Sequence, residues 1–207
     1  MEISAAVLVG GQSRRMGRDK ATLFVEGRPL IQWVISALER VADEILLVGH
    51  AVSRLEWLGL PTWEDLVPNG GPLAGIYTAL TVARHPLCLV VACDMPFLQP
   101  DLLRYIAEEA SGWDAAVPLV DGHLEPLHAI YARSCLKTIG EMLERGETCP
   151  LDLYPRVRTR YIGPEEIACF AGGRRSFINI NTPQELAQVA LAQVFQPAQT
   201  AHSPFGL

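Results

Sequence analysis

Apolar, strand-like runs alternate with helical patterns along this 207-residue chain, and this alternation limits the possible folds more than any other feature. Hydrophobic residues make up 49% of the sequence, enough to bury a substantial core within one domain. The spacing of apolar residues predicts strands at 3–9, 44–48, 86–93, 113–120 and 127–132, and helices at 29–41, 73–84, 100–110 and 134–145. Such alternation predicts an α/β fold with a mostly parallel sheet and helices on both faces.

The C-terminal part shows a clear strand-to-helix pattern. Residues 176–181 alternate polar and apolar side chains, as a half-buried strand does, and 182–185 (T-P-Q-E) form a capping box with proline in the first turn. A helix is expected over 183–195. We therefore predict a single domain over 1–195 and a mobile tail over 196–207, where prolines replace apolar residues.

A loop rich in glycine and positive charge follows the first predicted strand, with the sequence L-V-G-G-Q-S-R-R-M-G-R-D-K over 8–20. Its paired glycines allow the backbone to turn sharply and approach a ligand closely. Four of the seventeen basic residues lie here, and Lys20 is one of just two lysines in the chain. A lysine is a compact point charge that suits a phosphate cluster, so the loop is predicted to bind phosphate groups.

The spacing of this loop differs from two better-known glycine loops. Gly11 and Gly17 are six apart, Lys20 lies three beyond Gly17, and Ala21 follows where a Walker A loop has Ser or Thr. The loop does not match the G-x-G-x-x-G fingerprint of dinucleotide binding either, so the main sequence evidence for NAD binding is missing. The alternative to phosphate binding is a solvated basic loop.

Charge and cysteine usage exclude several classes of protein. The net charge of −6 and a pI of about 5.4 argue against a broad surface for nucleic acid or an anionic membrane. Five cysteines without a C-x-x-C pair suggest neither a disulfide framework nor a zinc site. The first strand begins within three residues, which leaves no room for a signal peptide, and no apolar run approaches the ~18 residues of a membrane span. We expect a cytoplasmic protein.

A second, looser basic region lies toward the C-terminus. It is either a solvated strand face or a second phosphate contact. Its members are Arg156, Arg158, Arg160, Arg174 and Arg175.

Polar residues at the predicted strand ends are candidates for a binding site, because ligands of open α/β sheets gather at the carboxyl ends of the strands. Asp94 follows an apolar strand and is either a turn cap or a magnesium ligand. Asp65 either binds a ribose or stabilises its loop, and Gly75 adds a glycine inside a helix. Asn179 and Asn181 share one face of their predicted strand, toward a ligand or toward solvent.

Five motifs resemble, in their order, those of the molybdenum cofactor guanylyltransferases. The resemblance extends to about Leu191, and the motifs are the loop above, E-D-L-V-P-N-G-G-P-L-A-G-I, C-D-M-P-F, E-P-L-H-A-I-Y and F-I-N-I-N-T-P-Q-E-L. Many nucleotidyltransferases share the first motif, whereas G-P-L-A-G and I-N-T-P-x-E-L point to this branch. The resemblance implies a Rossmann-like three-layer sandwich with a mostly parallel mixed sheet. It also implies magnesium-dependent transfer of GMP from GTP to the phosphate of molybdopterin, with release of pyrophosphate.

Residue roles follow from the same resemblance, motif by motif. The implied nucleotide contacts are Leu8, Val9, Gly10, Gly11, Lys20, Asp65, Gly75 and Asp94. The implied catalytic residues are Lys20, Arg15 and Asp94, with Asp94 also the metal ligand. Asn179 and Asn181 would lie toward the pterin, while His123 and His128 are expected to be structural or to contact the acceptor. One departure is Gly49-His50, where family members can carry an Asn for the nucleotide, so the base-recognising contact stays open.

The implied reaction is in-line attack of the acceptor phosphate on the α-phosphorus of GTP, which needs no protein nucleophile. The sequence of the first loop does not identify the base of the nucleotide. Two alternatives therefore stay open: a cytidylyltransferase for the same pterin, or a guanylyltransferase for another phosphorylated acceptor. A more distant alternative is a non-catalytic nucleotide-binding or cofactor-handover subunit. The implied partners are GTP, a molybdopterin-type acceptor and, transiently, proteins that deliver or receive the cofactor.

Overall fold

A computed structural model provides the fold and describes residues 2–10, 24, 25, 27–180 and 185. Most of the glycine loop, the helix predicted over 183–195 (except for Glu185) and the predicted tail lie outside the described residues.

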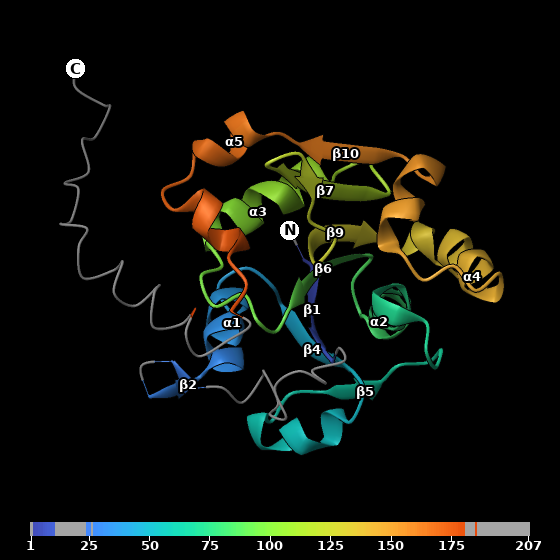
Figure 1. The fold of residues 1–207 in the computed structure, drawn as a ribbon, viewed down its shortest axis with the longest axis horizontal. Coiled ribbons are helices and arrows are strands. Elements are labelled where there is room, and N and C mark those ends of the chain that lie inside the picture. Colours follow the sequence, from blue (N-terminus) through green and yellow to red (C-terminus); the bar gives the residue numbers. More distant parts are fainter. Residues whose placement is uncertain (1, 11–23, 26, 181–184, 186–207) are drawn as a thin grey trace.

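An eight-stranded sheet forms the centre of the described part, in the order β10-β7-β9-β6-β1-β4-β5, with β8 paired to β7 (Figure 1). Its strands are β1 (Ser4–Val9), β4 (Glu44–Gly49), β5 (Thr62–Glu64), β6 (Leu87–Ala92), β7 (Ala115–Val120), β8 (His123–Leu124), β9 (His128–Ala132) and β10 (Thr159–Ile162). Strands β6, β1, β4 and β5 run parallel to one another, as do β7 and β10, whereas β9 is antiparallel to both β6 and β7. The prediction of a mostly parallel, mixed sheet is confirmed.

Helices cover both faces of this sheet. The α-helices are α1 (Leu30–Leu38), α2 (Gly71–Val82), α3 (Pro100–Glu109), α4 (Leu136–Glu144) and α5 (Pro164–Ala168). Short 3-10 helices are η2 (Val52–Leu58), η3 (Arg133–Cys135), η4 (Pro150–Arg156) and η5 (Gly173–Phe177), and β2 (Phe24–Val25) pairs with β3 (Arg28–Pro29) in a separate hairpin. In Figure 1, α1 and α3 lie on one side of the sheet and α2 and α4 on the other.

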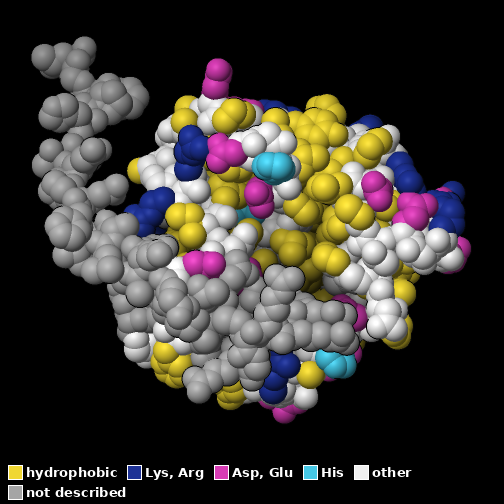
Figure 2. All heavy atoms as spheres, viewed as in Figure 1, with side chains coloured by type: hydrophobic (Ala, Val, Ile, Leu, Met, Phe, Trp, Pro, Cys, Tyr) yellow, Lys and Arg dark blue, Asp and Glu magenta, His cyan; other side chains and the backbone are white. Residues whose placement is uncertain are grey.

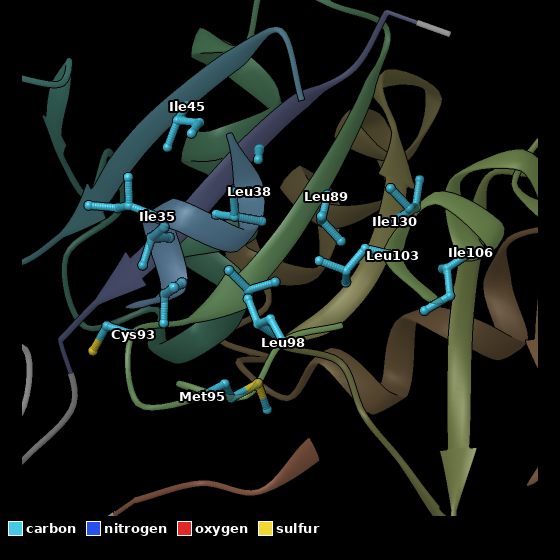
Figure 3. Close-up of a cluster of buried hydrophobic side chains, with 14 of the residues drawn as sticks. Ile35, Leu38, Ile45, Leu89, Cys93, Met95, Leu98, Leu103, Ile106 and Ile130 are labelled. Atoms are coloured by element: carbon cyan, nitrogen blue, oxygen red, sulfur yellow. The ribbon is translucent and has the colours of Figure 1, made fainter. Parts of the chain in front are cut away.

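Two hydrophobic clusters join these layers, one on each face of the sheet. Alternate residues of β1 enter different clusters: Val7 packs with α1 and α3, while Ala6 packs with α2 and α4. Figure 3 shows the first cluster, where Leu38 of α1, Leu89 of β6 and Leu103 of α3 meet. Because side chains alternate between two buried faces, β1, β4 and β6 are apolar apart from Ser4 and Glu44 at the starts of β1 and β4 and Gly49 at the end of β4.

The strand predicted over 176–181 is wrong. Residues 173–177 form η5, and 178–180 carry no strand pairing. Ser176, Phe177 and Ile180 are all buried, so burial does not alternate, and the Ile180 N–H bonds to the Asp94 carbonyl beyond the end of β6. Residues 150–162, for which the sequence pattern predicted no helix or strand, contain η4 and β10. Among the described helices, none is long and apolar enough to cross a membrane.

Candidate active site

The parallel strands β6, β1, β4 and β5 end at one edge of the sheet, where they bring together polar and glycine residues from four segments of the chain. The chain runs outward from β1 to β4 and β5, then returns to place β6 on the other side of β1, so strand order reverses at β1. The residues that follow these strands are Gly10, His50, Asp65 and, two residues after β6, Asp94. A crevice beside the carboxyl ends at such a reversal is the usual ligand site of this class of fold.

The ends of β1 and β4 approach each other very closely. A Cβ atom on Gly49 would lie 1.9 Å from the backbone oxygen of Val9, and the φ of Gly49 is +146°. Only glycine fits there, so an Asn at position 49 is sterically excluded. The neighbouring position behaves differently: His50 is exposed, and its backbone nitrogen lies 3.4 Å from a Cβ built on Gly10.

Asp65 follows β5 and has an unusual carboxylate. It is half-buried, and within the described residues its Oδ1 atom is buried without a hydrogen-bond partner. Burial raises the pKa of Asp65, the charge of Glu64 raises it further, and His50 opposes the shift. A buried acceptor without a partner is costly, so this oxygen is suited to accept a hydrogen bond from a ligand.

The loop after Asp65 is fastened to α2 by a residue that the sequence analysis did not identify. Leu66 donates its backbone N–H to the Thr78 hydroxyl at 3.0 Å, and that hydroxyl donates to the Ala74 carbonyl at 2.9 Å. Thr78 is fully buried on the apolar face of α2. The sequence signal for this role is the hydroxyl of Thr78 on the otherwise apolar face of the predicted helix.

Leu8 and Gly75 meet at the same edge, since Leu8 packs against the cluster of α2. The structure gives Gly75 a packing role, because its missing side chain leaves room for Leu8. Val9 points to the opposite face and is buried in the cluster of α1 and α3.

Asp94 and Asn179 are brought close by the backbone of the C-terminal segment. The Cys93 N–H donates to the Leu8 carbonyl at 3.3 Å, which ties the end of β6 to β1. The Ile180 N–H donates to the Asp94 carbonyl at 2.8 Å, and Asn179 beside it is exposed. Gly11, Arg15, Lys20 and Asn181 lie outside the described residues, so their places at this edge stay predictions.

The second basic region does not converge on a ligand. Four of its arginines pair with carboxylates: Arg156 with Glu147, Arg158 with Asp114, Arg160 with Glu109 and Glu166, and Arg174 with Asp121. Arg175 lies 5.2 Å from the centre of the Phe97 ring. Among the described side chains in Figure 2, Lys and Arg are scattered, several of them beside Asp or Glu. Of the five arginines, Arg160 alone lies in a strand, so this region is a set of local ion pairs and not one solvated strand face.

The two histidines of the E-P-L-H region have different environments. His123 in β8 is exposed, whereas His128 at the start of β9 is fully buried. Burial lowers the pKa of His128 to about 3, so its ring is neutral at ordinary pH.

Comparison with known proteins agrees with this geometry. Residues 5–157 match the family model described as a MobA-like NTP transferase domain. A probable molybdenum cofactor guanylyltransferase of Pelotomaculum thermopropionicum is 40% identical over 91% of this chain and 92% of its own, and one of Carboxydothermus hydrogenoformans is 34% identical over 88% and 92%. Among solved structures, molybdopterin-guanine dinucleotide biosynthesis protein A from Archaeoglobus fulgidus is similar with a TM-score of 0.79 and 31% identity, over 93% of this chain and all of the other.

A more distant structure shares the fold. The 2-C-methyl-D-erythritol 4-phosphate cytidylyltransferase from Thermus thermophilus is similar with a TM-score of 0.67 and 22% identity, over 93% of this chain and all of the other.

Proposed function

Because this chain belongs to the MobA-like NTP transferase family, we propose that it transfers GMP from GTP to the phosphate of molybdopterin and releases pyrophosphate. One observation carries the proposal: four parallel strands end together and place Gly10, Asp65 and Asp94 at one edge, with Asn179 beside them. The relatives named above as probable guanylyltransferases support the choice of nucleotide and acceptor.

The proposed reaction is a single in-line displacement. An oxygen of the acceptor phosphate forms a bond to the α-phosphorus of GTP, and the bond from that phosphorus to the bridging β-phosphate oxygen breaks. The acceptor phosphate is already ionised at neutral pH, so no residue needs to remove a proton. The protein contributes alignment and charge stabilisation. We propose that Lys20 and Arg15 stabilise the negative charge on the departing pyrophosphate and that Asp65 contacts the guanosine.

The residues at this edge fit a magnesium ion. Magnesium is usually held by one or two carboxylates together with substrate phosphates, and Asp94 supplies a half-buried carboxylate at the end of β6. Within the described ranges, no three His, Cys, Asp or Glu side chains cluster as a complete protein cage would require. When bound, magnesium would neutralise part of the triphosphate charge. We propose that Asp94 is its protein ligand.

Two further assignments complete the proposal. The reaction would take place in the cytoplasm, where GTP is supplied. The five cysteines form no disulfide in the described structure, as in a reducing compartment. The enzyme would contact, transiently, the proteins that deliver molybdopterin and receive the finished cofactor.

A transfer assay with two nucleotides tests the proposal. The purified protein is mixed with molybdopterin, magnesium and either GTP or CTP, and both pyrophosphate and the pterin dinucleotide are quantified. We expect the guanine dinucleotide and an equal amount of pyrophosphate from GTP, and little product from CTP. A cytosine product would reassign the base. Nucleotide binding without pyrophosphate release would indicate the non-catalytic subunit instead.

A further inference from the structure

A buried polar chain connects β9, η5 and the residue before α3. The backbone N–H of Gln99 donates to the Ser176 hydroxyl oxygen at 3.0 Å, and the same oxygen lies 3.4 Å from Nε2 of His128. His128 and Ser176 are both fully buried, and the ring of Phe177 packs on the imidazole with centroids 4.3 Å apart. The rest of the described structure offers Nδ1 of His128 no partner.

Counting hydrogen-bond donors and acceptors fixes the tautomer of His128. If Ser176 donates to Nε2, the proton of the neutral ring is on Nδ1, and one polar group, the Nδ1–H, lacks a partner among the described residues. If Nε2–H donates to Ser176 instead, two groups lack partners among the described residues: the serine hydroxyl hydrogen and the lone pair of Nδ1. Each unsatisfied buried group is costly, so the first arrangement is favoured.

His128 lies at the edge where the substrates are expected. Strand β9 runs antiparallel to β6, so its first residue lies opposite Val91, near the carboxyl end of β6. The Ala92 N–H donates to the Leu127 carbonyl at 3.1 Å and continues this pairing toward Asp94.

The segment that His128 contacts carries Asn179 and lies outside the sheet, with Ile180 packed among Leu30, Trp33 and Phe97. Residues 178–180 pair with no strand, so Asn179 is held by the contacts of its neighbours. On one side the Ile180 N–H bonds to Asp94, and on the other Ser176 and Phe177 are anchored on Gln99 and His128. An apolar side chain at position 128 would remove the Nδ1–H but would leave the buried Ser176 hydroxyl hydrogen without an acceptor among the described residues, so packing alone does not explain a histidine here.

We propose that His128, as the Nδ1–H tautomer, is a positioning residue: it accepts the Ser176 hydroxyl and thereby sets where Asn179 stands beside Asp94. The consequence for the pterin acceptor rests on the proposed function above, whereas the tautomer and the anchoring of the segment do not.

The tautomer is tested without any substrate. In protein carrying ¹⁵N-labelled histidine, long-range ¹H–¹⁵N correlation distinguishes a protonated ring nitrogen from an unprotonated one, and His128→Gln assigns the signals. We expect Nδ1 to be protonated and Nε2 to be unprotonated, with the Nε2 signal shifted in Ser176→Ala. A protonated Nε2, or an Nε2 signal that Ser176→Ala leaves unchanged, would overturn the proposal.

The positioning role is tested by separating acceptor binding from nucleotide binding. Ser176→Ala removes the donor, His128→Phe keeps the ring but removes the acceptor atom, and His128→Gln can restore an acceptor near the Nε2 position. We expect the first two variants to raise the KM for molybdopterin about tenfold, with the Kd for GTP unchanged, and the Gln variant to recover most of the loss. The double variant Ser176→Ala/His128→Phe should be no worse than either single variant.

His85→Phe serves as the control, because His85 is a partly buried histidine preceding β6, at the opposite edge of the sheet. Unfolding midpoints show which variants fold, and acceptor binding is also followed directly through the fluorescence of the pterin. Equal losses for GTP and molybdopterin, or an unchanged KM in Ser176→Ala, would contradict the positioning role. If wild-type protein forms no dinucleotide, the proposed function fails, while the NMR result still decides the tautomer.

Discussion

Leu8 at the end of β1 fills the space that a side chain on Gly75 of α2 would need. A Cβ atom on Gly75 would lie 2.9 Å from Cδ1 and 3.2 Å from Cδ2 of Leu8. Helix α2 therefore packs directly on the strand that leads into the glycine loop. This contact explains a glycine in the middle of a helix by packing, where the sequence suggested close approach to a nucleotide.

Gly75→Ala is expected to displace Leu8 and disturb the entrance to the loop. The added methyl group should lower the free energy of unfolding by about 1–3 kcal/mol, as overpacking usually does, and should raise the KM for GTP. Shortening the neighbour in Leu8→Val/Gly75→Ala should recover part of both losses. Urea unfolding and initial rates measure the two effects.

The control for this pair is Gly140→Ala in α4. A Cβ there would lie 3.6 Å from Tyr77, an ordinary contact, and alanine favours a helix interior over glycine. This variant should therefore be neutral or stabilising. If Gly75→Ala behaved like it, the close contact with Leu8 would carry no energetic weight.

Asp65→Asn should separate ligand binding from stability. Burial and the charge of Glu64 raise the pKa of Asp65, so ionising this carboxyl costs more free energy in the folded protein than in the unfolded chain. Removing the charge should not lower the free energy of unfolding. The affinity for GTP should fall about tenfold or more, because a charge-assisted hydrogen bond to the nucleotide is lost. Calorimetric titration with GTP and thermal unfolding measure the two quantities.

Glu64→Gln is the matched variant for Asp65→Asn. The carboxylate of Glu64 accepts the N–H groups of Ala51 and Val52, at 3.1 and 3.2 Å, and so holds the turn after β4. This variant should lower stability slightly and change GTP affinity little. A stability loss in Asp65→Asn without a loss of affinity would assign Asp65 to loop stabilisation.

Asp94→Ala should abolish most turnover while the protein stays folded. If Asp94 holds magnesium against the triphosphate, its loss should lower kcat by at least about a hundredfold, the scale of a lost electrostatic contact in a transition state. Binding of Mn²⁺ with GTP, followed by electron paramagnetic resonance, should weaken as well. Asp101→Ala, which removes an exposed carboxylate paired with Arg104, should retain full activity. High activity of Asp94→Ala at saturating magnesium would contradict the metal role.

The layers of this fold could be predicted from the sequence because the spacing of apolar residues in each strand and helix matches the faces that are buried. The apolar runs of β1, β4 and β6 are buried on both faces, and the period of α1 matches its buried side. Asp94 could be placed at the sheet edge for the same reason, because parallel strands put their carboxyl ends together. Asp65 follows β5, a three-residue strand that the spacing of apolar residues did not predict.

The remaining differences arise where contacts between distant segments decide. Alternation over 176–181 predicted a strand, but Ser176 is buried by its bonds to Gln99 and His128, which are 77 and 48 residues away. Gly49 and Gly75 are likewise explained by Val9 and Leu8, neighbours in space that no local pattern reveals. The spacing of apolar residues along a segment predicts which of its side chains are buried. It does not identify the distant residues that cover them.

The free energy of unfolding should depend on pH through His128. Burial lowers the pKa of His128 from 6.5 to about 3 in the folded protein, while the unfolded chain keeps the ordinary value. Between these values the unfolded state binds one more proton than the folded state. Acidification therefore lowers the free energy of unfolding, beginning near pH 6.5 and ending near pH 3, by up to about 1.4 kcal/mol per pH unit.

Comparison with His128→Phe isolates this contribution, because the other titrating groups are present in both proteins and their effects largely cancel. Urea unfolding at about pH 7.5 and pH 5.5 should show that wild-type protein loses about 1.4 kcal/mol more than the variant over this interval. The variant can differ in absolute stability without affecting the result, since the change with pH is what is compared. Parallel pH profiles would mean that His128 takes up a proton in the folded state, which would contradict its burial as a neutral ring against Phe177 and Ser176.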